Sequence, residues 1–240
     1  MKAIAVNHKA RHSTARLSER LAGQLLSVIY YPHPLSHGGL VLVFHDEVES
    51  LVDLITEAYT CVPLDLALHC LRRAELFELS LPTFTWLHVL NRRIHLGYCV
   101  KQTGVVLYGP DVRDEIPPPP EPRVLLNAHL ESCAHFMRNH AILGLLASEN
   151  YLELMKRIEW QMKCLMLTAL LLRGEWAANI DAIVPRFERA YQDEQIKSLW
   201  QELNALIDSI NWTDQATCRR AAYEAVWLFE CFLRRLREYA

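Results

Sequence analysis

The feature that most constrains the fold is a run of prolines in the middle of the chain. Residues 109–123 read GPDVRDEIPPPPEPR, with four prolines in succession. Proline fixes φ and lacks a backbone N–H, so such a run cannot continue a helix or an inner strand and favours an extended connector. Short apolar runs precede it and long helix-like segments follow it. We therefore predict two domains, residues 1–109 and 123–240, joined by a proline-rich linker at residues 110–122.

In the first half, apolar runs of strand type alternate with segments of helical spacing. We predict strands at residues 27–31, 40–45, 63–69 and 105–109, and helices at residues 13–25, 46–60 and 82–93. The second helix is expected to begin at Asp46, because an acceptor there with Glu49 three residues on resembles a capping box. Strands that alternate with helices predict a small α/β domain with a mixed sheet.

The second half has helical spacing nearly throughout and very little proline or glycine. We predict helices near residues 123–147, 149–173, 181–193, 194–210 and 213–238. Ser148 and Thr213 suit helix starts, while Gly174 and Asn211 suit helix ends. These segments predict an up-and-down bundle of four or more helices, so the whole chain is expected to be an α+β protein of two domains.

The order of these parts resembles a known pairing, a minimal nucleotidyltransferase-fold domain followed by a HEPN domain (higher eukaryotes and prokaryotes nucleotide-binding). Residues 87–109, LHVLNRRIHLGYCVKQTGVVLYG, are similar to the end of the first domain in such proteins. There a helix leads into a strand with a Gly-x-x-Leu-Tyr signature, here Gly104, Leu107 and Tyr108. The resemblance implies that the first half is a nucleotidyltransferase-like mixed sheet.

Residues 150–173, NYLELMKRIEWQMKCLMLTALLLR, resemble the second helix of a HEPN domain. In that helix a Glu and a Lys four residues apart precede a run of small and apolar residues, here Glu159 and Lys163. The resemblance implies a HEPN-like up-and-down helical bundle in the second half. Because HEPN bundles commonly self-associate through helix faces, it also implies a homodimer formed by the helical domain.

Active nucleotidyltransferases of this family hold two divalent metals with three carboxylates. They carry Gly-Ser at the end of one strand, Asp-x-Asp on the next and a third acid on a later strand. The chemistry requires these residues, since two cations need several anionic oxygen ligands at close range. Here the Gly-Ser position falls at residues 31–36, which end in PHPLS, and the Asp-x-Asp position at residues 39–44, which read GLVLVF. No acid is present at either place.

Asp65 stands where the third carboxylate is expected, with His69 on what we predict to be the same face of a strand. Together with Asp46 and His37, Asp65 is a candidate for catalysis. An alternative hypothesis is therefore a metal-dependent nucleotidyltransferase that uses Mg²⁺ at an unconventional site around Asp65.

The loop between the first two predicted strands offers two imidazoles, a hydroxyl and a flexible backbone. Such a loop can bind phosphate through its N–H groups. The candidate ligand-binding residues are His33, Ser36, His37, Gly38, Gly39 and Asp65. Two histidines four apart outside a helix are not a metal motif, so no metal is expected at this loop. No cofactor is expected apart from the Mg²⁺ of the alternative hypothesis.

A third hypothesis is a weak ribonuclease. Active HEPN ribonucleases carry an Arg and a His a few residues apart near their later helices, but no histidine follows His140 in this chain. Arg123 and His129 have a suitable spacing, yet they lie in the first predicted helix of the bundle. We therefore interpret this pair as a chance match.

Composition narrows the class of protein. The net charge of −3 argues against a broad nucleic-acid surface. Seven cysteines without a C-x-x-C pair indicate reduced thiols in a cytoplasmic protein. The first residues, MKAIAVNHKARHSTARL, lack the apolar core of a secretory signal. The most apolar long run, residues 158–172, is too short and too polar to cross a membrane.

These observations lead to one main expectation. With catalytic residues missing from both halves, we expect a non-catalytic protein that binds a nucleotide, another small phosphate ligand or a partner.

Overall fold

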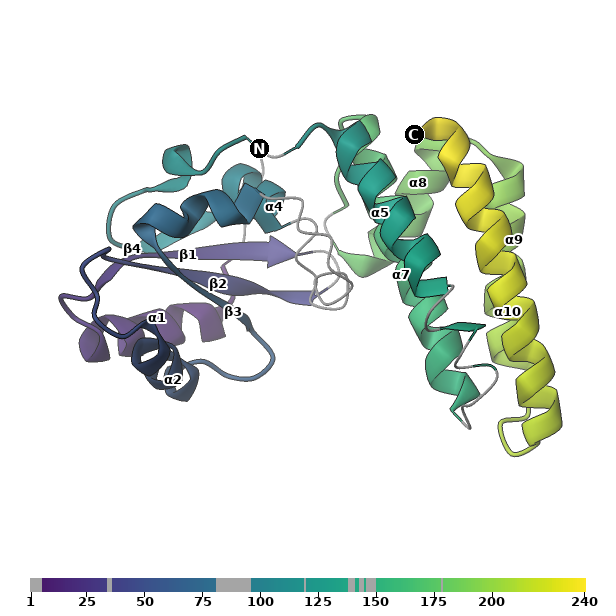
Figure 1. Ribbon diagram of the computed structural model, residues 1–240, viewed down its shortest axis with the longest axis horizontal. Coiled ribbons are helices and arrows are strands. Elements are labelled where there is room, and N and C mark those ends of the chain that lie inside the picture. The colour runs from purple at the N-terminus through teal and green to yellow at the C-terminus, as the bar shows by residue number, and fades with distance from the viewer. Residues whose placement is uncertain are drawn as a thin grey trace. The chain divides into compact units, whose positions relative to one another are not determined.

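The computed structural model describes residues 6–33, 36–80, 96–118, 120–137, 141–142, 145, 150–177 and 179–240. Its described residues form two compact units that divide between Pro120 and Glu121 (Figure 1). The first unit contains a sheet with helices, and the second is helical. The helix predicted at residues 82–93 lies outside the described residues.

The first unit is built around a mixed sheet of four strands in the order β3-β2-β1-β4. Strand β1 is antiparallel to both β2 and β4, whereas β2 and β3 are parallel. The elements in chain order are α1 (His8–Arg20), β1 (Leu25–His33), β2 (Ser36–Phe44), α2 (Leu51–Cys61), β3 (Ala67–Arg72), η1 (Arg73–Ser80), α4 (Leu96–Thr103), β4 (Val105–Tyr108) and η2 (Arg113–Glu115). The prediction of a mixed sheet is confirmed.

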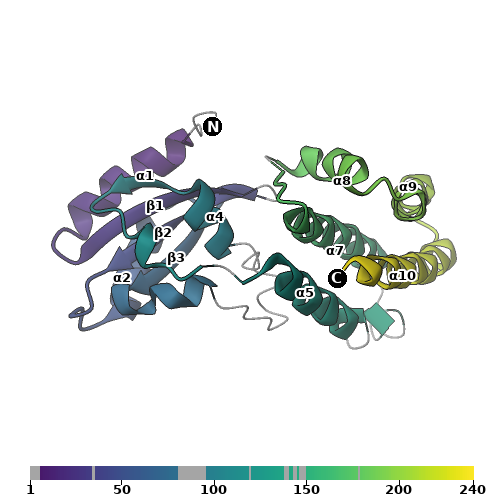
Figure 2. The ribbon, with the colours of Figure 1, turned by 90° about the horizontal axis from the view of Figure 1, so that it is seen from above.

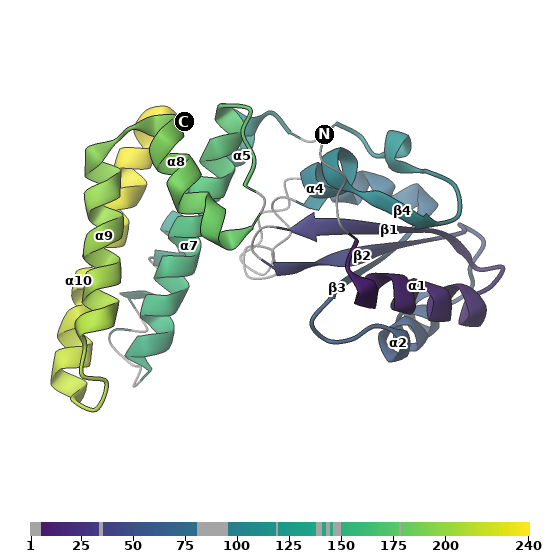
Figure 3. The same cartoon turned by 180° about the vertical axis from the view of Figure 1, so that it is seen from behind.

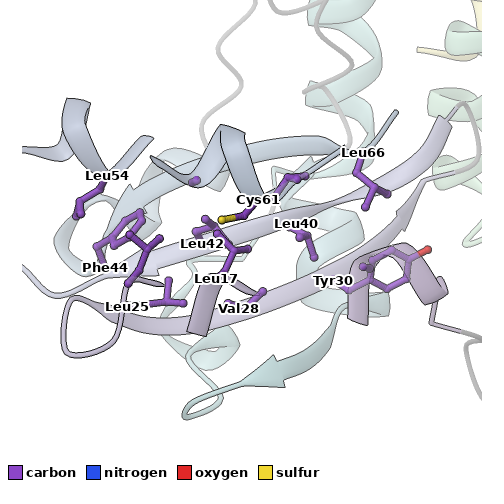
Figure 4. Packing of buried hydrophobic residues seen from close by; sticks show 14 residues of the cluster. Leu17, Leu25, Val28, Tyr30, Leu40, Leu42, Phe44, Leu54, Cys61 and Leu66 are labelled. Carbon is purple, nitrogen blue, oxygen red and sulfur yellow. The ribbon is translucent and has the colours of Figure 1, made fainter. Parts of the chain in front are cut away.

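Strand β2 is buried on both faces. The five residues from Leu40 to Phe44 have no exposed surface. Leu40, Leu42 and Phe44 pack into a cluster with residues of α1 and α2 (Figure 4). Helices α1 and α2 cover this face of the sheet, and α4 lies on the other face (Figures 1 and 3). An inner strand of a covered sheet requires an apolar run of this kind.

Helices α1 and α2 begin at other residues than the sequence pattern predicts. Helix α1 begins after Asn7, whose side chain accepts a hydrogen bond from the Lys9 N–H, and the predicted cap Ser13 is buried inside the helix. Helix α2 begins after Ser50, whose hydroxyl accepts from the Asp53 N–H. The prediction that Asp46 starts this helix is therefore wrong.

The third strand also begins later than its alternating leucines predict. Strand β3 begins at Ala67, while Leu64 and Asp65 lie in a turn closed by a hydrogen bond from the Leu66 N–H to the Pro63 carbonyl. Leu64 is 98 % exposed, so the alternation does not mark a buried strand face at that position.

Part of the predicted linker packs into the first unit. Val112 and Ile116 are buried, and the short helix η2 lies between them. The Glu115 carboxylate accepts two hydrogen bonds from the Arg73 guanidinium at 2.7 Å each. This fork-to-fork pairing is the strongest geometry for the two groups. The first unit therefore extends beyond residue 109.

The second unit consists of helices packed around α7. Its elements are α5 (Pro122–Phe136), α7 (Tyr151–Leu172), η4 (Ile180–Ala182), α8 (Ile183–Tyr191), α9 (Glu194–Ser209), α10 (Gln215–Leu236) and η5 (Arg237–Tyr239). Helix α7 contacts α5, α8 and α10, and α10 contacts α9 (Figure 2). Because α7 is enclosed by these neighbours, its apolar residues are buried around most of its circumference. None of the described helices is long and apolar enough to cross a lipid bilayer.

The helix ends of this unit agree in part with the sequence pattern. Gly174 adopts φ +67° directly after the end of α7, as predicted for a helix-ending glycine. Helix α10 is capped by Asp214 and not by Thr213, because the Asp214 carboxylate accepts the Ala216 N–H. Helix α7 follows Asn150, and Ser148 lies outside the described residues.

A buried aspartate joins the start of α9 to the end of α10. The Asp193 carboxylate accepts N–H groups of Gln195 and Ile196 through Oδ1. Its Oδ2 accepts hydrogen bonds from Arg235 at 2.8 Å and from the Tyr239 hydroxyl at 2.5 Å. Burial raises the pKa of Asp193, but the hydrogen bonds from Tyr239, Ile196 and Arg235 outweigh burial and hold it below its usual value.

This geometry gives a prediction for Asp193→Asn. The amide oxygen keeps the helix cap, but the charge that pairs with Arg235 is lost, so the free energy of unfolding at pH 7 should fall by about 2 kcal/mol. A lowered carboxyl pKa stabilises the fold above the unfolded value of about 3.9 and loses that effect as the pH falls below it. Urea unfolding should therefore show a smaller gap between wild type and variant at pH 3.

The matched control is Asp214→Asn, the same change at an exposed helix cap. It should lower the free energy of unfolding much less than Asp193→Asn does, because the Asp214 side chain is exposed to solvent. Equal losses for the two variants at pH 7 would contradict the role assigned to the Arg235 and Tyr239 contacts.

Candidate functional site

The two candidate carboxylates lie at opposite ends of the sheet. Strands β2 and β3 run parallel and in register, with Gly39 at one end of the paired region and Phe44 at the other. Asp65 precedes β3 and so lies at the Gly39 end, whereas Asp46 follows β2 and lies at the Phe44 end. Five strand steps of roughly 3.3 Å separate these ends. The structure therefore does not bring Asp46 and Asp65 together around one metal ion.

Asp65 pairs with a lysine on α1. Its Oδ2 lies 2.5 Å from Lys9 Nζ, and both side chains are partly exposed. The prediction that His69 and Asp65 share one face of a strand is wrong, because Asp65 lies in the turn before β3. His69 Nε2 lies 2.7 Å from the Tyr31 hydroxyl on β1. The predicted pair is thus divided between two separate interactions.

Asp46 has a structural role that its sequence position does not indicate. Its Oδ1 accepts a hydrogen bond from the backbone N–H of Ala74 at 2.8 Å. That N–H belongs to the first turn of η1, directly after β3. Asp46 therefore stabilises a helix start 28 residues further along the chain.

The predicted ligand-binding loop is largely strand. His33 ends β1, and Ser36 and His37 begin β2, with side chains outside the described part of the structure. Gly38 and Gly39 are buried in β2.

The two glycines allow close packing. Gly38 has φ +81°, and a Cβ there would lie 2.4 Å from the Tyr31 carbonyl oxygen. A Cβ on Gly39 would lie 2.6 Å from both the Ala67 carbonyl oxygen and the Tyr31 hydroxyl. Packing against β1 and β3 explains these glycines without a bound ligand.

The Arg123–His129 pair is not assembled into an accessible site. Arg123 lies in the exposed first turn of α5, whereas His129 is fully buried and its Nδ1 lies 2.8 Å from Thr168 Oγ1 on α7. The Thr168 hydroxyl donates to the Cys164 carbonyl, so it accepts from the His129 Nδ1–H. Burial lowers the pKa of His129 to about 3, although a hydrogen bond with Gln161 opposes the shift. The imidazole is therefore neutral and shielded at neutral pH.

The acidic groove beside α2 does not form a metal site. This groove of about 560 Å³ lies at the start of α2 and is lined in part by Glu47, Glu49 and Asp53. In the described part of the chain, no group of three or more His, Cys, Asp or Glu side chains could hold a metal ion.

A second pocket is basic and was missed by the sequence interpretation. This basic pocket, of about 440 Å³, lies between α1 and the end of α2. Its lining residues are His8, Lys9, His12, Ser13 and Arg16 from α1, and Thr60, Cys61, Val62 and Pro63 from the end of α2 and the residues after it. The sequence contains the spacing that indicates this pocket: His8, His12 and Arg16 lie four residues apart, and such residues share one face wherever the chain is helical.

Hydrogen bonds hold the basic pocket together. Arg16 Nη2 donates to the Thr60 carbonyl at 3.1 Å. Arg20, on the next turn of α1, donates to Glu57 at 2.5 Å and to the Thr60 hydroxyl at 3.0 Å. These contacts fix α1 against the end of α2.

Comparison with known proteins gives no relative: no protein family, curated protein or solved structure matches the chain. The functional argument therefore depends on the residues of the chain itself.

The burial of His129 predicts a pH dependence of stability. The unfolded chain binds a proton at this residue near pH 6.5 and the folded chain only near pH 3, so stability should fall as the pH drops through this window. The loss should reach about 2 kcal/mol between pH 6.5 and pH 5. His129→Gln should remove this part of the slope in urea unfolding curves.

The range from pH 7 to pH 9 provides the internal control. His129 is neutral there in both states, so the stabilities of wild type and variant should run parallel. A wild-type slope between pH 6.5 and pH 5 that His129→Gln leaves unchanged would contradict the prediction.

Proposed function

We propose that this protein is a non-catalytic binding protein, a cytoplasmic pseudoenzyme with a degenerate nucleotidyltransferase-like unit and a HEPN-like helical unit. The first unit binds a nucleotide or another small phosphate ligand, and the second pairs with another copy of the chain. The observation that carries the proposal is the interior of β2. The positions where the resembling enzymes place Asp-x-Asp are occupied here by apolar residues without exposed surface.

The remaining carboxylates support the absence of two-metal chemistry. Such chemistry needs anionic ligands converging on ions about 4 Å apart. Asp46 and Asp65 lie at opposite ends of the sheet. Asp65 is paired with Lys9, which opposes the binding of a cation there.

The state of the cysteines supports the proposed location of the protein in a reducing compartment, the cytoplasm. All seven are free thiols, and five of them are buried. Burial raises the pKa of the Cys70 thiol to about 12, so this group stays protonated and unreactive at neutral pH. Disulfide-free thiols of this kind are typical of cytoplasmic proteins.

The proposal predicts nucleotide binding that does not depend on magnesium. Calorimetry with ATP or GTP should give the same affinity in Mg²⁺ and in EDTA, and binding should survive in Asp65→Ala. Incubation with a nucleoside triphosphate should release no pyrophosphate. Metal-dependent binding that Asp65→Ala abolishes would instead favour a nucleotidyltransferase with a site around Asp65.

The pairing of two copies is assigned to one stripe on α10. We define the α10 stripe as Arg220, Tyr223, Trp227, Glu230 and Arg234, which are spaced alternately three and four residues apart and so share one helix face. Tyr223 is 44 % exposed and Trp227 is 58 % exposed. Two exposed aromatic residues on successive turns are suited to contact another protein surface.

The charges of the α10 stripe are complementary to themselves. Along the sequence, Arg220 and Glu230 each lie five residues from Ala225, on opposite sides of it. Tyr223 and Trp227 each lie two residues from it, also on opposite sides. An antiparallel pair of α10 helices centred there places each Arg220 against a Glu230 and each Tyr223 against a Trp227 of the other copy. A two-fold interface requires this self-complementarity.

Sedimentation equilibrium at micromolar concentration should therefore show a dimer. Trp227→Lys should give a monomer, because it places a charge at the centre of the contact. Leu64→Lys, a matched change at an exposed apolar residue of the first unit, should leave the dimer intact. Arg220→Glu should weaken the dimer, and the double variant Arg220→Glu with Glu230→Arg should restore it. A monomeric wild type would reject the dimer.

A further inference from the structure

We propose that the basic pocket between α1 and α2 is where the phosphate groups of a small ligand bind. This inference rests on the proposed function, because it assigns a place and a charge requirement to ligand binding. The lining residues of this pocket come from α1 and from the end of α2 and the residues after it, and they include none of the described residues of 33–39.

The charge of the pocket selects an anion. Lys9 contributes an amine and Arg16 a guanidinium, and His8 and His12 add two imidazoles to the same lining. Among the described residues that line the pocket, none is acidic. The chain as a whole has a net charge of −3, so the basic lining of this pocket is opposite in sign to the net charge of the protein. A local cationic concavity raises the concentration of anions at its surface.

The spacing of these groups directs them to one place. His8, His12 and Arg16 follow one another at intervals of four residues, and Lys9 lies next to His8. All four side chains belong to exposed residues of α1 on the side that faces the end of α2. Consecutive members of this series lie one helical turn apart, so a ligand with several anionic groups can contact more than one of them.

Arg16 is held in place before any ligand binds. Its hydrogen bond to the Thr60 carbonyl uses one of the five N–H donors of a guanidinium. The adjacent contacts of Arg20 with Glu57 and Thr60 fix the same stretch of α1. A cation that is already ordered loses less conformational entropy on binding.

The size and donor set favour phosphate over a carboxylate. A volume of about 440 Å³ is within the range of small-molecule sites. Arginine matches two phosphate oxygens at once, and Lys9, about two helical turns before Arg16, supplies a second charge. A diphosphate or triphosphate has enough charge and enough oxygens to use both residues, which a single carboxylate does not.

Asp65 acts as a competitor within this arrangement. In the unliganded protein its carboxylate binds Lys9 Nζ at 2.5 Å, so an incoming phosphate must share that ammonium or take it from Asp65. The side chain of Lys9 is 57 % exposed and can turn toward the pocket without unpacking the core. Asp65 therefore lowers the affinity of the site for anions, which is the opposite of the effect of a metal ligand.

Calorimetry with inorganic pyrophosphate and with ATP, without metal, tests the inference on the full chain. Lys9→Gln and Arg16→Gln should each weaken binding of both probes roughly tenfold. Asp65→Asn should strengthen binding, and this gain cannot come from a loss of folding. The matched control is Arg11→Gln, which removes an exposed cation of α1 that does not line the pocket, and it should leave both affinities unchanged.

The outcomes separate the place of binding from the function. If ATP binds the wild type but Lys9→Gln and Arg16→Gln bind it equally well, the basic pocket is the wrong place and the proposed function stands. If neither probe binds the wild type, both are rejected. Sedimentation with phosphatidylserine vesicles distinguishes a lipid source, and binding to vesicles without binding to pyrophosphate would overturn the assignment to a small ligand.

Discussion

The buried strand β2 is the constraint on which the first unit depends. A strand without exposed surface from Leu40 to Phe44 must have a neighbour on each edge and apolar cover on each face. Strands β1 and β3 provide the edges, and α1 and α2 provide the cover on one face. Complete burial of one such side chain contributes about 2 kcal/mol. The same burial excludes carboxylates from the strand, so polar function must lie at the sheet ends or on the outer helices.

The sequence predicts which segments are helices and strands better than it predicts the residues at which they begin. Apolar runs and helical spacing locate most of the helices and strands because core burial imposes those periods. The starts depend on hydrogen bonds that the local pattern does not encode. Asp46 has the local context of a helix cap, yet its carboxylate binds Ala74, which folding brings beside it. Leu64 continues an alternating pattern, yet it lies in a solvated turn.

The candidate site was harder to predict for a topological reason. Asp46 and Asp65 are both plausible ligands in the sequence, but the parallel pairing of β2 with β3 sends them to opposite ends of the sheet. No local spacing reveals that pairing. The basic pocket was missed because the first helix was expected to begin at Ser13, which left His8 and Lys9 outside it. Their shared face with Arg16 exists only because Asn7 starts the helix earlier.

The order of the elements along the chain has a consequence for synthesis on the ribosome. The sheet of the first unit is complete once β4 has emerged, well before α7 is made. Helix α7, in contrast, packs against α10, which follows it by more than forty residues. Because domains fold as units during translation, the nascent helical unit exposes the apolar surface of α7 until α10 arrives. While the residues between these two helices are being made, the face of α7 that α10 covers in the folded protein has no cover.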